Sequence, residues 1–121
     1  MLRNKTISNL RTGAGLGLLV LSLAACGEGP GDPTGSTCPD DSTLTWETFG
    51  EAFVTNNCSR CHASQESPRL ASQRDVQGNI DIIDRVAASG PNATNTFMPE
   101  EGEVSDADRK KLGEWLACGA P

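Results

Sequence analysis

Residues 58–62 read Cys-Ser-Arg-Cys-His, and their two thiols and one imidazole have the spacing that attaches a haem covalently. The two-residue gap between Cys58 and Cys61 matches the separation of the two haem vinyl groups, so each thiol can form a thioether. His62 follows directly and can reach the iron as an axial ligand. The pattern therefore predicts one covalently bound haem c. A zinc cluster and a thiol–disulfide redox pair are the alternatives for the same residue types.

Met98 is the candidate for the second axial ligand of the iron. His62 is the only histidine of the chain, and Met98 is its only methionine after the first residue. Met98 is expected in a loop, from which a thioether can reach the far side of a haem, and Pro99 restricts the backbone there. The alternative is that Met98 fills a hydrophobic core. Lys110 and Lys111 are the other strong donors, but they are expected on the solvent side of a helix.

The first 25 residues have the features of a bacterial signal peptide. Basic residues precede an uninterrupted small and apolar run from Gly13 to Ala25, which is too short to span a bilayer. The run ends Leu-Ala-Ala-Cys and resembles the lipobox of bacterial lipoproteins, which are cut before the cysteine and lipidated on it. We therefore expect a signal over residues 1–25 and a lipidated Cys26 that tethers an exported, periplasmic protein to a membrane. Gly27 favours the outer membrane, and an ordinary signal cleavage site is the alternative.

Cleavage before Cys26 changes the net charge from −6 to −9, because it removes three basic residues and no acidic ones. Such an acidic surface disfavours binding to nucleic acid, and it favours redox partner proteins with a basic docking surface. The alternative is that the charge serves only solubility. Residues 26–43 are rich in Gly, Pro, Ser and Thr, which predicts a flexible linker. The folded domain is therefore expected over residues 44–121, as a monomer.

The remaining pattern predicts an all-α domain with three to four short helices. Helices are expected over residues 45–56, 72–88 and 105–118, each starting at a Ser or Thr N-cap. Their apolar residues at helical spacing are Trp46, Phe49 and Phe53, then Val76, Ile80, Ile83 and Ala87, and finally Leu112, Trp115 and Leu116. So small a core is marginal by itself, and a covalently held haem supplies the missing apolar centre.

The order of these features resembles a small single-haem cytochrome c of class I over about residues 44–121. Cys-Ser-Arg-Cys-His follows a first helix, Met-Pro lies in a later loop, and the chain ends with a helix followed by Gly-Ala-Pro. The resemblance implies thioethers at Cys58 and Cys61, with His62 and Met98 as the axial ligands. The chain departs from the family at Glu100, where relatives commonly have a second proline.

The resemblance also implies that the first and last helices cross near the haem edge. Cys38 precedes the first of these helices and Cys118 ends the last, so the crossing brings together the two cysteines left without another role. In an oxidising compartment they are expected to form a disulfide. Two free thiols are the alternative.

We therefore expect a membrane-tethered electron-transfer protein rather than an enzyme, since no acid–base or nucleophile constellation is evident. The alternative is a haem-based sensor or small-ligand-binding domain in which Met98 does not hold the iron permanently. A further alternative is a zinc module, whose ligands would come from Cys38, Cys58, Cys61, His62 and Cys118.

Overall fold

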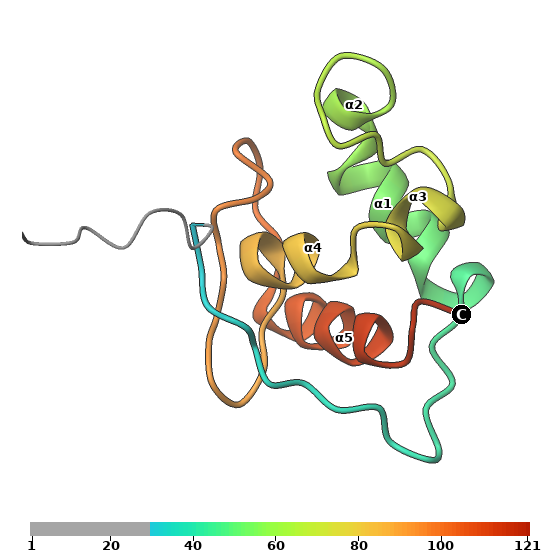
Figure 1. Cartoon of the computed structure of the whole chain (residues 1–121), viewed down its shortest axis with the longest axis vertical. Coiled ribbons are helices and arrows are strands. Elements are labelled where there is room, and N and C mark those ends of the chain that lie inside the picture. The colour runs from blue at the N-terminus through green and yellow to red at the C-terminus, as the bar shows by residue number, and fades with distance from the viewer. Residues whose placement is uncertain (1–29) are drawn as a thin grey trace, which may run out of the picture.

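In the computed structural model, which describes residues 30–121, the chain folds into one π-helical turn and five α-helices (Figure 1). The elements are η1 (Trp46–Gly50), α1 (Glu51–Asn57), α2 (Ser59–His62), α3 (Gln73–Gln77), α4 (Ile80–Ala87) and α5 (Asp106–Ala117). The only β-type pairing within this range is an isolated bridge between Ser89 and Thr94. The predicted all-α class is thus confirmed. None of the described helices has both the length and the apolar character required to cross a membrane.

The first predicted helix begins at its expected cap but as a wider turn. The Thr45 hydroxyl accepts a hydrogen bond from the Thr48 main-chain N–H at 3.2 Å, and the Thr48 hydroxyl accepts one from the Thr45 N–H at 2.8 Å. The Gly50 N–H reaches back to the Thr45 carbonyl at 3.0 Å, which closes the π turn η1. A side chain at Gly50 would collide with the Trp115 ring, so glycine permits the close approach of these two elements.

The second predicted helix, residues 72–88, is two helices, and the prediction of one continuous helix was wrong. Ser72 caps α3 as expected by accepting from the Asp75 N–H at 3.3 Å. The helix then stops at Gly78, a residue with low helix propensity. The side-chain amide of Asn79 donates to the Asp75 carbonyl at 2.7 Å and thereby satisfies a group that the break leaves without a helical partner.

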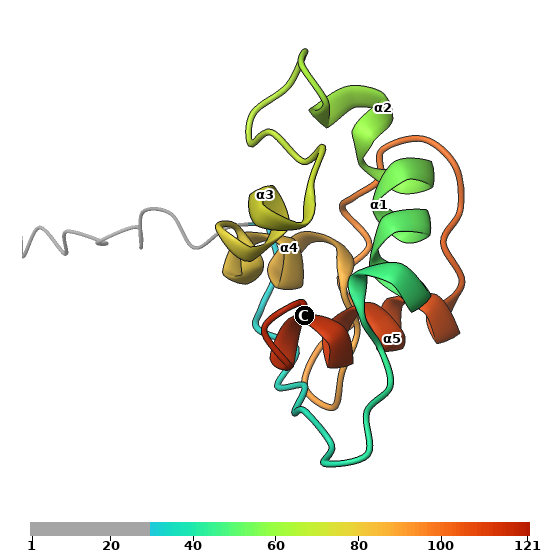
Figure 2. The same ribbon diagram turned by 90° about the vertical axis from the view of Figure 1, so that its right-hand side faces the viewer.

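The hydrophobic core forms where α5 lies against η1, α1 and α4. Trp115 is fully buried, and its ring centroid lies 6.2 Å from that of Trp46 and 5.9 Å from that of Phe49. Leu112 and Leu116 are buried beside it. Figures 1 and 2 show α5 running across the foot of α1 and next to α4. The predicted apolar face of the last helix is confirmed.

Residues 30–43, here called the N-terminal strap, differ from the flexible linker that their composition predicted. The strap runs over the folded unit in an extended conformation and passes α5 before it reaches η1 (Figure 1). Thr34 is fully buried, and both its hydroxyl and its N–H are bonded to Asp84 of α4. The Asn95 amide donates to the Asp32 carbonyl at 2.8 Å. Hydrogen bonds rather than apolar residues hold this segment, which is why its polar composition gave no sign of it.

The strap is also joined covalently to the end of the last helix. Cys38 and Cys118 form a disulfide, with their Cα atoms 4.7 Å apart. Gly119 follows at the left-handed φ of 87° that often ends a helix. The terminal carbonyl of Pro121 then accepts a hydrogen bond from the Trp46 N–H at 2.6 Å. The C-terminal residues are therefore fastened to the end of the strap and to the start of η1.

Candidate haem-binding site

A single break between two helices positions the thiols and the imidazole. α1 ends at Asn57, Cys58 leaves helical geometry with φ −119°, and α2 begins at Ser59. The Cys58 N–H still donates to the Val54 carbonyl at 2.8 Å, while the Cys58 carbonyl accepts from the His62 N–H at 2.9 Å. The motif is thus attached to α1 at one end and wound into one helical turn at the other. This arrangement keeps the two thiols and the imidazole of the motif on a short, ordered stretch of backbone.

The orientation of His62 is determined by a loop that follows it. The Nδ1 atom of His62 lies 2.8 Å from the carbonyl oxygen of Pro68, a group that can only accept, so Nδ1 carries the proton. Nε2 is then the ring atom with a free lone pair, as an iron ligand requires. The loop is held in turn, since the Leu70 N–H donates to the His62 carbonyl at 2.7 Å and the Ser59 hydroxyl donates to the Leu70 carbonyl at 2.8 Å. Sequence reasoning missed Pro68, for which a proline soon after the motif was the only signal.

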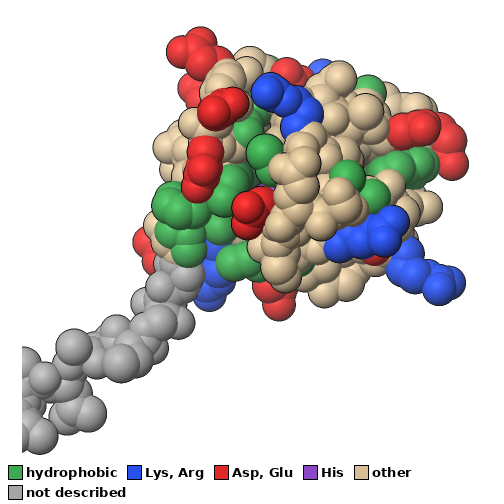
Figure 3. Space-filling view, turned by 90° about the horizontal axis from the view of Figure 1, so that it is seen from above, with side chains coloured by type: hydrophobic (Ala, Val, Ile, Leu, Met, Phe, Trp, Pro, Cys, Tyr) green, Lys and Arg blue, Asp and Glu red, His purple; other side chains and the backbone are tan. Residues whose placement is uncertain are grey.

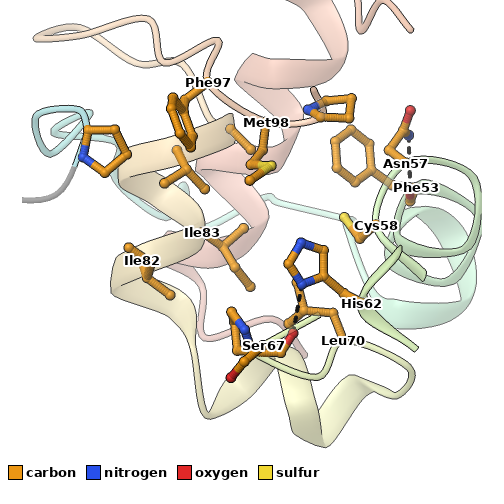
Figure 4. A pocket seen from close by; sticks show the side chains of 15 residues that line it. Phe53, Asn57, Cys58, His62, Ser67, Leu70, Ile82, Ile83, Phe97 and Met98 are labelled. Carbon is orange, nitrogen blue, oxygen red and sulfur yellow. Dashed lines mark hydrogen bonds between the residues drawn. The ribbon is translucent and has the colours of Figure 1, made fainter. Parts of the chain in front are cut away.

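His62 faces an apolar cavity with a volume of about 220 Å³, here called the cleft. The apolar residues of its wall are Pro30, Phe53, Pro68, Leu70, Ile82, Ile83, Val86, Ala87, Phe97 and Pro99. In Figure 4 Met98 lies across the hollow from His62, and the Cys58 sulfur lies between them at the side. A second hollow continues past Cys58, His62 and Met98 and is bordered by Cys61.

These features fit a covalently bound haem. The cleft supplies an apolar lining for a flat hydrophobic ring, one imidazole with its lone pair free, and one thioether on the opposite side. Both thiols border the connected hollows. The structure therefore brings together Cys58, Cys61, His62 and Met98, the four residues that the sequence marked for this role.

Burial distinguishes the two thiols. Burial raises the pKa of the Cys58 thiol from 9.0 to about 11, because the low-dielectric surroundings disfavour the thiolate. Cys61 is exposed. The fold therefore disfavours the thiolate form of Cys58.

The main chain of Met98 is hydrogen-bonded to two helices. The Met98 N–H donates to the Val86 carbonyl of α4 at 2.8 Å. The Met98 carbonyl accepts from the guanidinium of Arg109 in α5 at 2.9 Å. Sequence reasoning missed Arg109, since a basic residue in the first turns of an amphipathic helix predicts only solvation.

Charged side chains border the open side of the second hollow. Arg60 and Glu101 pair across it at 3.7 Å, and both are well exposed to solvent. Glu66 and Glu100 border the same hollow. Figure 3 looks onto this end of the molecule and shows acidic and basic side chains spread around exposed hydrophobic ones. Such an exposed ion pair contributes little to stability.

The other predicted residues lie elsewhere. Cys26 and the signal lie outside the described residues. Cys38 and Cys118 are bonded to each other, so they do not join the motif, and no cluster of three metal-ligating His, Cys, Asp or Glu side chains occurs within residues 30–121. The zinc alternative is therefore not supported by the geometry.

The two candidate lysine ligands are also placed apart from the cleft. Lys110 and Lys111 are exposed on α5, and Lys111 lies 3.9 Å from Asp108. Neither lines the cleft.

One protein family matches the chain. The sequence model described as cytochrome c oxidase, cbb3-type, subunit III, matches residues 47–116. This range includes the whole motif, the Met98 loop and nearly all of α5. No curated protein and no solved structure matches the chain significantly.

Proposed function

Because this chain belongs to the family of cytochrome c domains that includes subunit III of the cbb3-type oxidases, we propose that it is a single-haem electron carrier with His/Met ligation. One observation carries the proposal: His62 and Met98 face each other across one apolar cleft, with the Cys58 sulfur at its side. In the proposed carrier, Cys58 and Cys61 hold the haem covalently. His62 and Met98 would hold its iron.

When bound, the haem supplies a one-electron couple between Fe(II) and Fe(III). Met98 contributes a weak thioether donor, which favours Fe(II) and so raises the midpoint potential relative to a harder donor. As a ligand, Met98 would also keep oxygen and other small ligands off the iron. The apolar wall of the cleft excludes water. Together these residues favour electron transfer over ligand binding or substrate turnover.

We expect the partners to be redox proteins that dock with a basic surface. The open side of the second hollow is bordered by Glu66, Glu100 and Glu101, with Arg60 as the nearby cation. The net charge of −9 after removal of the signal acts in the same direction. Salt would weaken such an association, since the charges are exposed.

We further propose that Cys26 is lipidated and holds the domain on the periplasmic side of a membrane, with the outer membrane favoured. Only residues 27–29 lie between Cys26 and Pro30, the first described residue, which lines the cleft. Even fully extended, the chain from Cys26 to Pro30 spans only about 14 Å. The proposed anchor would therefore hold the cleft much closer to the lipid surface than a linker ending at residue 43 would.

The ligation is tested by replacing Met98 in haem-loaded protein. Met98→Leu keeps the volume but removes the sulfur, so we expect loss of the sulfur-to-iron absorption band at the red end of the oxidised spectrum. The midpoint potential should fall, and CO or cyanide should bind quickly. Met98→His should restore six-coordination at a lower potential. Thr96→Ser, at an exposed position of the same loop outside the cleft wall, serves as the control.

Covalent attachment of the haem to Cys58 and Cys61 is tested separately. Haem should stay with the parent protein through acid–acetone extraction, and Cys58→Ala or Cys61→Ala should leave at most one thioether.

An unchanged spectrum and potential in Met98→Leu would refute ligation by Met98. Rapid CO binding by the parent protein would favour the alternative, a haem-based sensor or small-ligand-binding domain.

A further inference from the structure

Arg109 is the only charged side chain among the buried residues of the described range, with 5% of its surface exposed. No carboxylate within residues 30–121 forms a salt bridge with it. Instead its Nη1 atom donates to three main-chain carbonyls: Ala87 at 2.7 Å, Asn95 at 2.9 Å and Met98 at 2.9 Å. A buried charge is costly unless it is well hydrogen-bonded, so a position like this one needs a reason.

The three acceptors belong to two different segments, the end of α4 and the loop that follows it. Ala87 is the last residue of α4, where carbonyls lack helical partners and the helix dipole is negative. Asn95 and Met98 belong to the irregular segment between α4 and α5. One guanidinium on α5 therefore binds the end of α4 and two points of the Met98 loop. Hydrogen bonds from a charged donor are stronger than neutral ones, which suits it to this task.

The charge itself is retained in this position. Burial lowers the pKa of Arg109, while the nearby carboxylate of Asp106 acts in the opposite direction. Arginine nevertheless stays protonated in proteins. A permanent positive charge is thus placed against the main chain of the residue that faces His62 across the cleft.

We propose that Arg109 is a positioning residue that holds the Met98 thioether toward the cleft and whose buried charge raises the midpoint potential of the bound haem. The proposal rests on the proposed function, because it takes Met98 as the axial ligand. With the Val86 contact on its N–H and the Arg109 contact on its carbonyl, the backbone of Met98 is held on both sides. Removal of Arg109 should leave one of these contacts and free the loop.

Two substitutions and a matched control test the proposal in the full chain loaded with haem. Arg109→Gln removes the charge and shortens the donor. Arg109→Lys keeps the charge, but its side chain ends one bond short of the Nη1 position, so its ammonium reaches fewer of the three carbonyls. Lys110→Gln makes the same charge change one residue along α5, where the side chain is exposed, so it reports the effect of net charge alone.

In Arg109→Gln we expect a weaker sulfur-to-iron band, a lower midpoint potential than in Lys110→Gln, and cyanide binding at least about tenfold faster. Hydrogen exchange at the Met98 amide should also accelerate by about tenfold or more. Arg109→Lys should recover most of the potential and only part of the amide protection, since it restores the charge without the three-way contact.

The proposal would be overturned if Arg109→Gln had the same midpoint potential, cyanide-binding rate and Met98 amide exchange rate as Lys110→Gln. If Arg109→Gln does not yield folded holoprotein, Arg109→Lys decides: faster amide exchange than in the parent supports the contact, and parental exchange refutes it. Failure of the proposed function is distinguishable, because the parent protein itself would then lack the sulfur-to-iron band.

Discussion

The hydroxyl of Thr34 donates a 2.6 Å hydrogen bond to one carboxylate oxygen of Asp84, and the Thr34 N–H donates to the other at 2.8 Å. The two residues are 50 positions apart, and Thr34 is fully buried. Asp84 belongs to α4, whose residues Ile83 and Ala87 line the cleft. The N-terminal strap therefore supports one wall of the cleft through this pair.

Loss of the Thr34–Asp84 pair should destabilise the domain. Thr34→Val removes the hydroxyl and leaves a carboxylate oxygen unpaired, for which we expect a loss of about 1–3 kcal/mol in the free energy of unfolding. Urea titration of the haem-loaded protein measures it. Asp81→Asn, on an exposed side chain of the same helix, is the control and should cost much less. Equal stability of Thr34→Val and the parent would mean that the strap is held weakly in solution.

The two motif thiols should react at different rates in protein prepared without haem. Iodoacetamide reacts with thiolates, so exposed Cys61 should be alkylated faster at pH 8 than Cys58, whose pKa is raised to about 11. Peptide mass mapping over time measures both rates. Equal rates would show that the haem-free chain does not bury Cys58.

The same shift predicts a pH dependence of stability for the haem-free protein. A thiol whose pKa is raised in the fold ionises at lower pH in the unfolded chain. Its contribution to the free energy of unfolding is therefore complete below about pH 9 and is lost as the pH rises toward 11. Denaturant midpoints between pH 8 and pH 11 should fall accordingly. Cys58→Ser, with no thiol to ionise in this range, should reduce the slope.

The Cys38–Cys118 disulfide should contribute strongly to stability. It closes a loop of 80 residues, for which loop entropy gives about 4.5 kcal/mol as an upper figure. Dithiothreitol should lower the denaturant midpoint of the parent but not of Cys38→Ser/Cys118→Ser, while haem thioethers resist this reagent in both. Labelling of both residues as free thiols in exported protein would contradict the bond.

Cys26→Ser should block lipid-signal processing or release the domain from the membrane. Stable anchoring requires more than one acyl chain, which a bacterial lipoprotein cysteine acquires. Fractionation and mass spectrometry of the mature N-terminus measure the outcome, with Cys38→Ser/Cys118→Ser as a cysteine control that should stay anchored. An unmodified N-terminus in membrane-free protein would refute the anchor.

Local sequence patterns predicted correctly those features that depend on residues close together in the chain. Thr45, Ser72 and Ser105 each cap the helix predicted for them, because an N-cap bond joins residues only three positions apart. The buried face of α5 follows from helical periodicity in the same way. By contrast, the break between α3 and α4 depends on a side-chain bond from Asn79 that competes with helix continuation. Propensity alone did not resolve that competition.

The cofactor chemistry could be predicted from the sequence alone, because Cys58, Cys61 and His62 lie within one short segment whose spacing must match the haem. The surroundings of that chemistry depend on how the chain folds. The tertiary structure placed Pro68 on His62, Arg109 on the Met98 carbonyl and Thr34 on Asp84. The His62–Pro68 and Arg109–Met98 contacts involve a main-chain carbonyl, a group that every residue carries, and the Thr34–Asp84 contact joins distant positions. No composition or spacing rule marks such partners, since their pairing depends on which backbone segments the fold brings together.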